Sequence, residues 1–218
     1  MESHDRPEVL ETHFAPPERL SDEEMLGLNR TYASFDTANR LIDSIPDLVM
    51  VLSHTRQVVA VNKSLVSALG VERPEELIGM RPGEVVDCVH SHEMPAGCGT
   101  SVSCASCDAV QAILDCIDKR QATARECRII TFEDSGEGLL DLYVEAIPIT
   151  VDSLTLYVIT MRDNKQARAV DPPGFIPRRT DDQSPGVWGI EMLVESLFGQ
   201  RAVVGEPIRM HLRIAVAP

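Results

Sequence analysis

The stretch "LIDSIPDLVMVLSHTRQVVAVNKSLVSALG", residues 41–70, decides how this chain is expected to fold. Two short β-rich runs, 47–53 and 57–62, flank a tight turn at His54–Arg56, which predicts a β-hairpin. Asn62 then begins a short helical segment, and Gly70 ends it as glycines commonly end helices. The domain is therefore expected to start with a hairpin that runs into a short helix.

The rest of the central region adds one longer helix and further strands. A cysteine-rich loop leads into a helix that is predicted over about 104–119. Three strand-like runs joined by tight turns follow: 122–133, 138–151 and 153–163. Strands that each bury one apolar face, combined with short helices, predict an α+β fold. The expected architecture is a five-stranded antiparallel sheet with helices on one face.

The N-terminal part is expected to supply a tail and one amphipathic helix. Residues 1–20 carry prolines and charges without apolar periodicity, which predicts a disordered tail. Ser21 and Glu24 match a capping box, and a helix over 21–45 is predicted to follow. Its seam has spacings of three and four residues: Met25, Leu28, Tyr32, Phe35, Asn39 and Ile42. Such a seam either forms a homodimer, with Asn39 fixing the register, or packs on its own domain.

The charge balance limits the expected partners. Acidic residues outnumber basic ones 34 to 20, for a formal net charge of −14. A surface this negative repels phosphate backbones and anionic lipids, so no nucleic acid or membrane partner is expected. The polar N-terminus has no leader pattern, and no apolar run approaches the roughly 18 residues of a membrane span. A cytoplasmic location is therefore expected.

Four of the six cysteines lie in "CVHSHEMPAGCGTSVSCASC", residues 88–107. Cys88, Cys98, Cys104 and Cys107 have the spacing C-x9-C-x5-C-x2-C, which favours a metal site or redox chemistry in a reducing compartment. Because the predicted helix starts at Cys104, its N-terminal end is expected to stabilise thiolates there. These four cysteines are the predicted metal ligands.

Three interpretations of this cysteine cluster remain open. Four thiolates suit an iron–sulfur cluster or a zinc ion that braces the loop, and Cys104 with Cys107 could instead form a switchable disulfide. His90 and His92 could each replace a thiolate, although we expect solvated loop histidines. Cys116 and Cys127 stand apart and are predicted to be buried as small apolar residues.

Three segments together resemble a PAS domain, over about residues 40–164. They are the opening stretch 41–70, "EELIGMRPGEVV" (75–86) and "LYVITMRDN" (156–164). The cysteine-rich insert 88–107 is similar to one found in a subset of bacterial sensor histidine kinases. The resemblance implies a sensory module, and it favours iron–sulfur over zinc because zinc carries no redox signal. The flavin-reactive cysteine phrase of light-sensing PAS domains is absent, as is a haem-binding histidine on the 104–119 helix.

The sequence after residue 164 contains no recognisable kinase. Residues 165–218 are far fewer than the roughly 200 needed for a phosphoacceptor helix pair and an ATP-binding domain. We therefore expect a non-enzymatic, truncated sensor histidine kinase that acts on a separate kinase or response partner. Residues 165–218 are predicted to form a linker and an irregular tail, for which a frameshifted remnant is one explanation.

Overall fold

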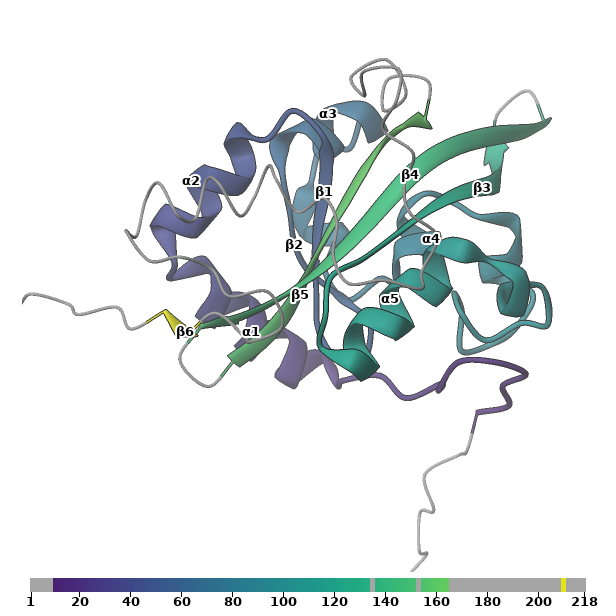
Figure 1. Cartoon of the computed structure of the whole chain (residues 1–218), viewed down its shortest axis with the longest axis horizontal. Coiled ribbons are helices and arrows are strands. Elements are labelled where there is room, and N and C mark those ends of the chain that lie inside the picture. Colours follow the sequence, from purple (N-terminus) through teal and green to yellow (C-terminus); the bar gives the residue numbers. More distant parts are fainter. Residues whose placement is uncertain (1–9, 134–135, 152–153, 165–208, 211–218) are drawn as a thin grey trace, which may run out of the picture.

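The computed structural model describes residues 10–133, 136–151, 154–164 and 209–210 (Figure 1). The predictions made for 1–9, and for 165–218 apart from two residues, lie outside this described part. Five strands form one antiparallel sheet in the order β2-β1-β5-β4-β3. They are β1 (Leu48–Leu52), β2 (Val58–Val61), β3 (Thr123–Glu133), β4 (Gly136–Val151) and β5 (Leu154–Asp163). A two-residue strand β6 (Arg209–Met210) pairs with β4 in parallel. The predicted α+β class with a five-stranded antiparallel sheet is confirmed.

The opening hairpin forms as its sequence predicts. The turn between β1 and β2 is closed by the Ser53 amide, which donates to the Gln57 carbonyl at 2.8 Å. Arg56 adopts a left-handed φ of 68° within this turn. After β2, the Asn62 side chain caps helix α3 (Lys63–Leu69), and Gly70 ends that helix with φ 65°.

Short helical segments carry the chain from α3 to the long helix. They are η1 (Pro74–Leu77), α4 (Pro82–Val85), η2 (Val89–His92) and η3 (Ser103–Ser106). Helix α5 (Asp108–Lys119) then covers the sheet. The expected start of this helix at residue 104 is wrong, because Cys104 lies in the separate turn η3 and Cys107 is the N-cap of α5.

Both faces of the sheet are covered, in contrast to the predicted arrangement with helices on one face. Along β1, Met50 and Leu52 pack with α3, α4 and α5, whereas Val49 and Val51 pack with α1 on the opposite face. Strand β5 alternates in the same way, so the two central strands are buried on both sides. The second face is covered because the N-terminal helices fold back over it.

The N-terminal helix is divided into two helices. Helix α1 (Asp22–Ala33) begins with the predicted capping box of Ser21, and α2 (Asp36–Ser44) follows a break at Ser34–Phe35. The prediction of one continuous helix over 21–45 is therefore wrong. Met25 and Tyr32 of the seam are buried against the chain's own sheet, and Asn39 donates to the Ala33 carbonyl at 3.3 Å. The homodimer through this region stays a prediction.

Residues 10–20, which we call the strap, are ordered against the domain. The amides of His13 and Ala15 donate to the carbonyls of Thr100 and Gly99 at 2.8 and 2.9 Å, and the Ala15 side chain is buried. The prediction that 1–20 is a disordered tail is therefore wrong for residues 10–20. Composition alone misled because the strap is held through its backbone rather than through apolar side chains.

Candidate functional site

The loop that carries the cysteines is held in place by α4. The Glu84 carboxylate accepts from the amides of Arg81 at 2.9 Å and Cys98 at 3.1 Å, and it also pairs with Arg19 of the strap. Gly83 allows the loop to approach closely, because a Cβ at this position would lie only 2.7 Å from Cys98 Sγ. One carboxylate and one glycine therefore fix the middle of a loop that has few large apolar side chains.

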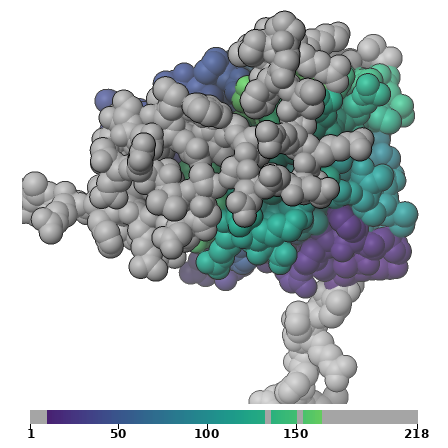
Figure 2. All heavy atoms as spheres, in the orientation of Figure 1, coloured from purple at the N-terminus to yellow at the C-terminus, as the bar shows by residue number. Residues whose placement is uncertain are grey.

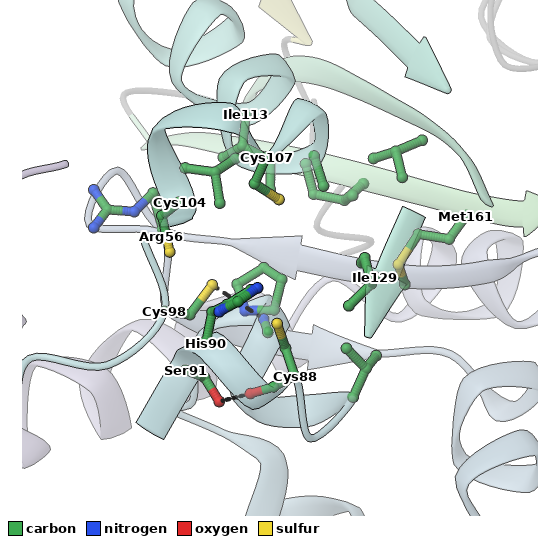
Figure 3. Close-up of a pocket in the computed structure, with 17 residues that line it drawn as sticks. Arg56, Cys88, His90, Ser91, Cys98, Cys104, Cys107, Ile113, Ile129 and Met161 are labelled. Atoms are coloured by element: carbon green, nitrogen blue, oxygen red, sulfur yellow. Dashed lines mark hydrogen bonds between the residues drawn. The ribbon is translucent and has the colours of Figure 1, made fainter. Parts of the chain in front are cut away.

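The four predicted ligands line a single cavity of about 50 Å³ between the loop, α5 and the sheet (Figure 3). Cys88 lies at an isolated bridge to Thr131 of β3, and the Gly83 amide donates to Cys98 Sγ at 3.3 Å. Ser101 Oγ donates to Cys104 Sγ at 3.3 Å, and Cys107 caps α5. The fold thus brings together sulfurs that are spread over twenty residues of sequence.

The other walls of the cavity are mostly apolar. Side chains from α5 and the sheet line it, among them Ile113, Ile129, Val144, Ile159 and Met161. A cavity needs roughly 10–15 Å³ and several hydrogen-bonding partners to hold one water well. The space is larger than that minimum, yet thiols are weak hydrogen-bonding groups, so its lining suits a sulfur-bound group better than water.

The four cysteines share one cavity. Among the residues that the structure describes, no group of three or more cysteine, histidine, aspartate or glutamate side chains is arranged to hold a metal ion. A tetrahedral zinc would need four sulfurs at about 2.3 Å from one centre. The described side chains are therefore not pre-arranged around a single ion, whether zinc or iron.

Burial dominates the electrostatics of these thiols. It raises the pKa of Cys98 to about 12, although the hydrogen bond from Gly83 acts in the opposite direction. Burial also raises the pKa values of Cys88 and Cys107, and the neighbouring cavity cysteines add to both shifts. For Cys107 the amides of Val110 and Ala109 favour the thiolate, but they do not outweigh desolvation. The expectation that the helix start supplies a low-pKa thiolate is therefore wrong for Cys107.

Two buried arginines beside the cavity had no assigned role in the sequence analysis. Arg56 lines the cavity and is 5% exposed, and Arg81 is fully buried behind Cys98. Neither guanidinium forms an ion pair within the described ranges, and Arg81 Nε finds no hydrogen-bond partner there. Burial lowers the pKa of Arg81 to about 10. Buried charges are usually paired, and the carboxylates that act on these two are Glu84 for Arg81 and Glu18 for Arg56.

The two loop histidines have different surroundings. His90 lines the cavity, and its Nδ1 is 2.6 Å from Glu93 Oε1. That hydrogen bond holds the pKa of Glu93 below its usual range. His92 Nε2 is 2.8 Å from Asp87 Oδ1, and its ring contacts Phe132. His92 is thus exposed as expected, whereas His90 is half-buried and lines the cavity.

The remaining cysteines pack as the sequence predicts. Cys116 and Cys127 are 0% and 4% exposed within the core between α5 and the sheet. Burial raises the pKa of each thiol to about 12. Neither lines the cavity, so both serve as internal controls for the four that do.

Comparisons with known proteins were made for the whole chain. No family model and no curated protein matches the sequence. Among solved structures, a PAS domain from a two-component sensor histidine kinase is 15% identical, with a TM-score of 0.40, and the match covers 62% of this chain and 99% of that one. The PAS domain of nitrogen regulation protein NR(II) from Vibrio parahaemolyticus is 14% identical, with a TM-score of 0.41 and coverages of 58% and 96%.

A third similar structure is the PAS domain of BvgS from Bordetella pertussis. It is 12% identical, with a TM-score of 0.39 and coverages of 62% and 92%. All three matches are structural likenesses at low identity, and each covers about three fifths of this chain. In the part of the chain described here, no helix combines the length and apolar character needed to cross a membrane.

Proposed function

We propose that this chain is a PAS-type sensory module whose four cavity cysteines bind an iron–sulfur cluster that reports redox state or oxygen. One observation carries the proposal: thiols from three separate segments line one apolar cavity beside two buried guanidinium groups. Four cysteine thiolates are the usual ligands of iron–sulfur clusters. Further support comes from the raised pKa values of the thiols, the two buried arginines and the apolar walls of the cavity.

The thiols would have to lose their protons to bind a metal. Because burial raises the pKa values of Cys88, Cys98 and Cys107, this deprotonation is unfavourable without a cation to replace the protons. Arg56 and Arg81 offset the resulting negative charge, and the apolar walls limit access of water. An iron–sulfur cluster would supply a one-electron redox change at this position.

The other interpretations explain less of the site. A single zinc ion would brace the loop but would supply no redox change. A disulfide switch requires an exposed, low-pKa thiolate, but Cys104 is 4% exposed and the pKa of Cys107 is raised. Zinc as a structural brace and a metal-free dithiol are therefore outcomes of the test.

The experiment is metal and sulfide analysis, with a visible spectrum, on the full chain purified without oxygen. Iron, sulfide and a broad absorption band are expected. Each of the variants Cys98→Ala and Cys104→Ala removes a ligand, so each should bind more than about tenfold less iron than the unmodified chain. Cys116→Ala is the matched control and should keep it. Stoichiometric zinc would replace the proposal with a structural brace, and a protein free of metal would refute both metal assignments.

The signal would then pass to another protein. We propose a separate kinase or response protein as the partner, and a homodimer through residues 21–45. Exposed Leu26 on α1 is available for such contact, whereas Met25 and Tyr32 are used inside the domain. Sedimentation masses of the full chain and of its Leu26→Glu variant test the dimer. A monomer mass for both proteins would refute it.

A further inference from the structure

The strap closes directly over the cysteine loop. Its His13 and Ala15 amides bond to the Thr100 and Gly99 carbonyls, next to Cys98 in sequence. In Figure 1 the N-terminal segment runs below α5 to reach this loop, and Figure 2 shows its atoms packed against those of the loop region. The strap contains no regular secondary structure, so these contacts and those of nearby arginines determine where it lies.

The same two arginines that flank the cavity hold the strap. Arg56 Nη2 donates to the Pro16 carbonyl at 2.8 Å. Arg81 Nη2 donates to the carbonyls of Pro17 at 3.1 Å and Glu18 at 2.7 Å. Through Nη1, Arg81 also donates to the Cys98 carbonyl at 3.3 Å. Each guanidinium therefore contacts the strap and also adjoins the cysteine site.

Arg56 and Arg81 lie near a third positive charge, Arg19, and near two carboxylates, Glu18 and Glu84, so their charges are only partly balanced when the thiols are neutral. Their charges are buried, and carbonyl oxygens are the only acceptors found for them in the described residues. A metal centre bound by four thiolates carries net negative charge, whether it contains iron or zinc. Such a centre would lower the cost of keeping both guanidinium groups buried, and so of keeping their hydrogen bonds to the strap.

We propose that Arg56 and Arg81 couple the negative charge of a centre in the cysteine-lined cavity to the strap, which is held closed when the centre is present and opens when it is lost. This inference rests on the proposed function, because it needs an anionic centre in the cavity. The strap leads directly into the capping residue Ser21 of α1, and the Leu20 amide bonds to Gln57 at 2.6 Å. Opening of the strap would therefore free the start of α1, the helix that covers the opposite face of the sheet.

The test is hydrogen exchange at the amides of His13 and Ala15 in the full chain. Protein purified without oxygen is compared before and after removal of its metal with a chelator. Exchange at both amides should become about tenfold faster after removal, the factor expected when hydrogen bonds to charged groups weaken. Exchange at the Val49 amide in the sheet core should not change, which separates strap opening from global unfolding.

Arg81→Gln provides the matched variant test. In this variant the strap amides should exchange fast with or without metal. Arg128→Gln removes an exposed charge on β3, and its strap amides should exchange as they do in the unmodified chain. Arg56→Gln, which removes one strap bond instead of two, provides a second variant if Arg81→Gln does not fold. The proposal is overturned if strap exchange in Arg81→Gln equals that in Arg128→Gln. If Arg56→Gln is used in place of Arg81→Gln, the same comparison applies to it.

The outcomes also separate this inference from the proposed function. If the chain holds metal but strap exchange is the same after its removal, the coupling is refuted and the metal site stands. If the metal is zinc and strap exchange responds, the iron–sulfur assignment fails and the coupling stands. If no metal is bound at all, both are refuted.

Discussion

The two faces of the sheet are covered by different kinds of structure. Against α1, the sheet buries a dry cluster of side chains: Met25, Tyr32, Val49, Val51, Val59, Leu156 and Val158. Against α5, the core continues into a cavity of about 50 Å³ that is lined partly by thiols. Side-chain packing holds the first face, whereas the loop at the second is held by hydrogen bonds to Glu84 and two arginines. The second face thus keeps a space beside four cysteines, and this is where we propose a bound group.

The largest effect on stability is expected where the two faces are tied together. Asn62 is fully buried, and its Oδ1 accepts from the amides of Val49 and Leu65, both at 3.0 Å. Its Nδ2 donates to carbonyls around the end of α2, including that of Asp47 at 2.9 Å. Asn62→Ala should lower the free energy of unfolding by about 3–4 kcal/mol, because several buried partners lose their hydrogen bonds.

Urea denaturation of the full chain measures this loss. Asn29→Ala is the matched control, because Asn29 makes one bond, to the Val59 carbonyl at 2.8 Å, from a half-buried position. It should cost about 1 kcal/mol. Equal costs for the two variants would show that Asn62 does not tie the faces together.

A pair of truncations compares the packing of the two faces. Leu156→Ala, in the dry cluster, should cost about 3 kcal/mol. Ile113→Ala, at the cavity wall, should cost about 2 kcal/mol in metal-free protein, because a side chain beside a void has fewer contacts to lose. Chemical denaturation of both variants measures the difference. A larger loss for Ile113→Ala would mean that the cavity side is packed as tightly as the α1 side.

A smaller effect should separate two glycines with similar backbone angles. Gly97 and Gly79 have φ values of 80° and 86°, but a Cβ at Gly97 would collide with Glu84, whereas nothing lies within 4 Å of one at Gly79. Gly79→Ala should cost about 1 kcal/mol from backbone strain alone, and Gly97→Ala about 2 kcal/mol or more. Thermal melts of the two variants make the comparison, and similar losses would argue against Glu84 as the centre of the loop.

The smallest effect is a pH dependence of the metal-free protein. The pKa of Cys98 is raised to about 12, so the fold favours its neutral thiol. A group with a raised pKa contributes stability that is complete below its ordinary pKa and is lost as the pH rises toward the folded value. The free energy of unfolding should therefore decline above about pH 9. Cys98→Ala should reduce this decline, and an identical pH profile in the variant would contradict the assignment.

The succession of strands along the chain and the hairpin could be predicted because they depend on local signals. The continuous apolar run of β1, the turn after Ser53 and the cap at Gly70 all act within a few positions. The cysteine spacing likewise identified residues that the fold gathers around one cavity.

The parts that prediction missed depend on contacts between distant segments. The strap has almost no apolar periodicity, and it is ordered because Arg81 reaches carbonyls 63 and 64 positions earlier in the chain. Burial of Arg56 and Arg81 could not be foreseen either, because arginine normally marks the surface. The break between α1 and α2 similarly follows from wrapping over the sheet, which the seam of residues 21–45 does not reveal.

The strap's position in the chain has a consequence for how the protein is made. A ribosome synthesises the N-terminus first, so the strap emerges long before the Gly99 and Thr100 carbonyls to which its amides bond. It cannot close until the whole cysteine loop has left the exit tunnel. The strap is thus synthesised before the loop to which it bonds and takes its place only after that loop has emerged.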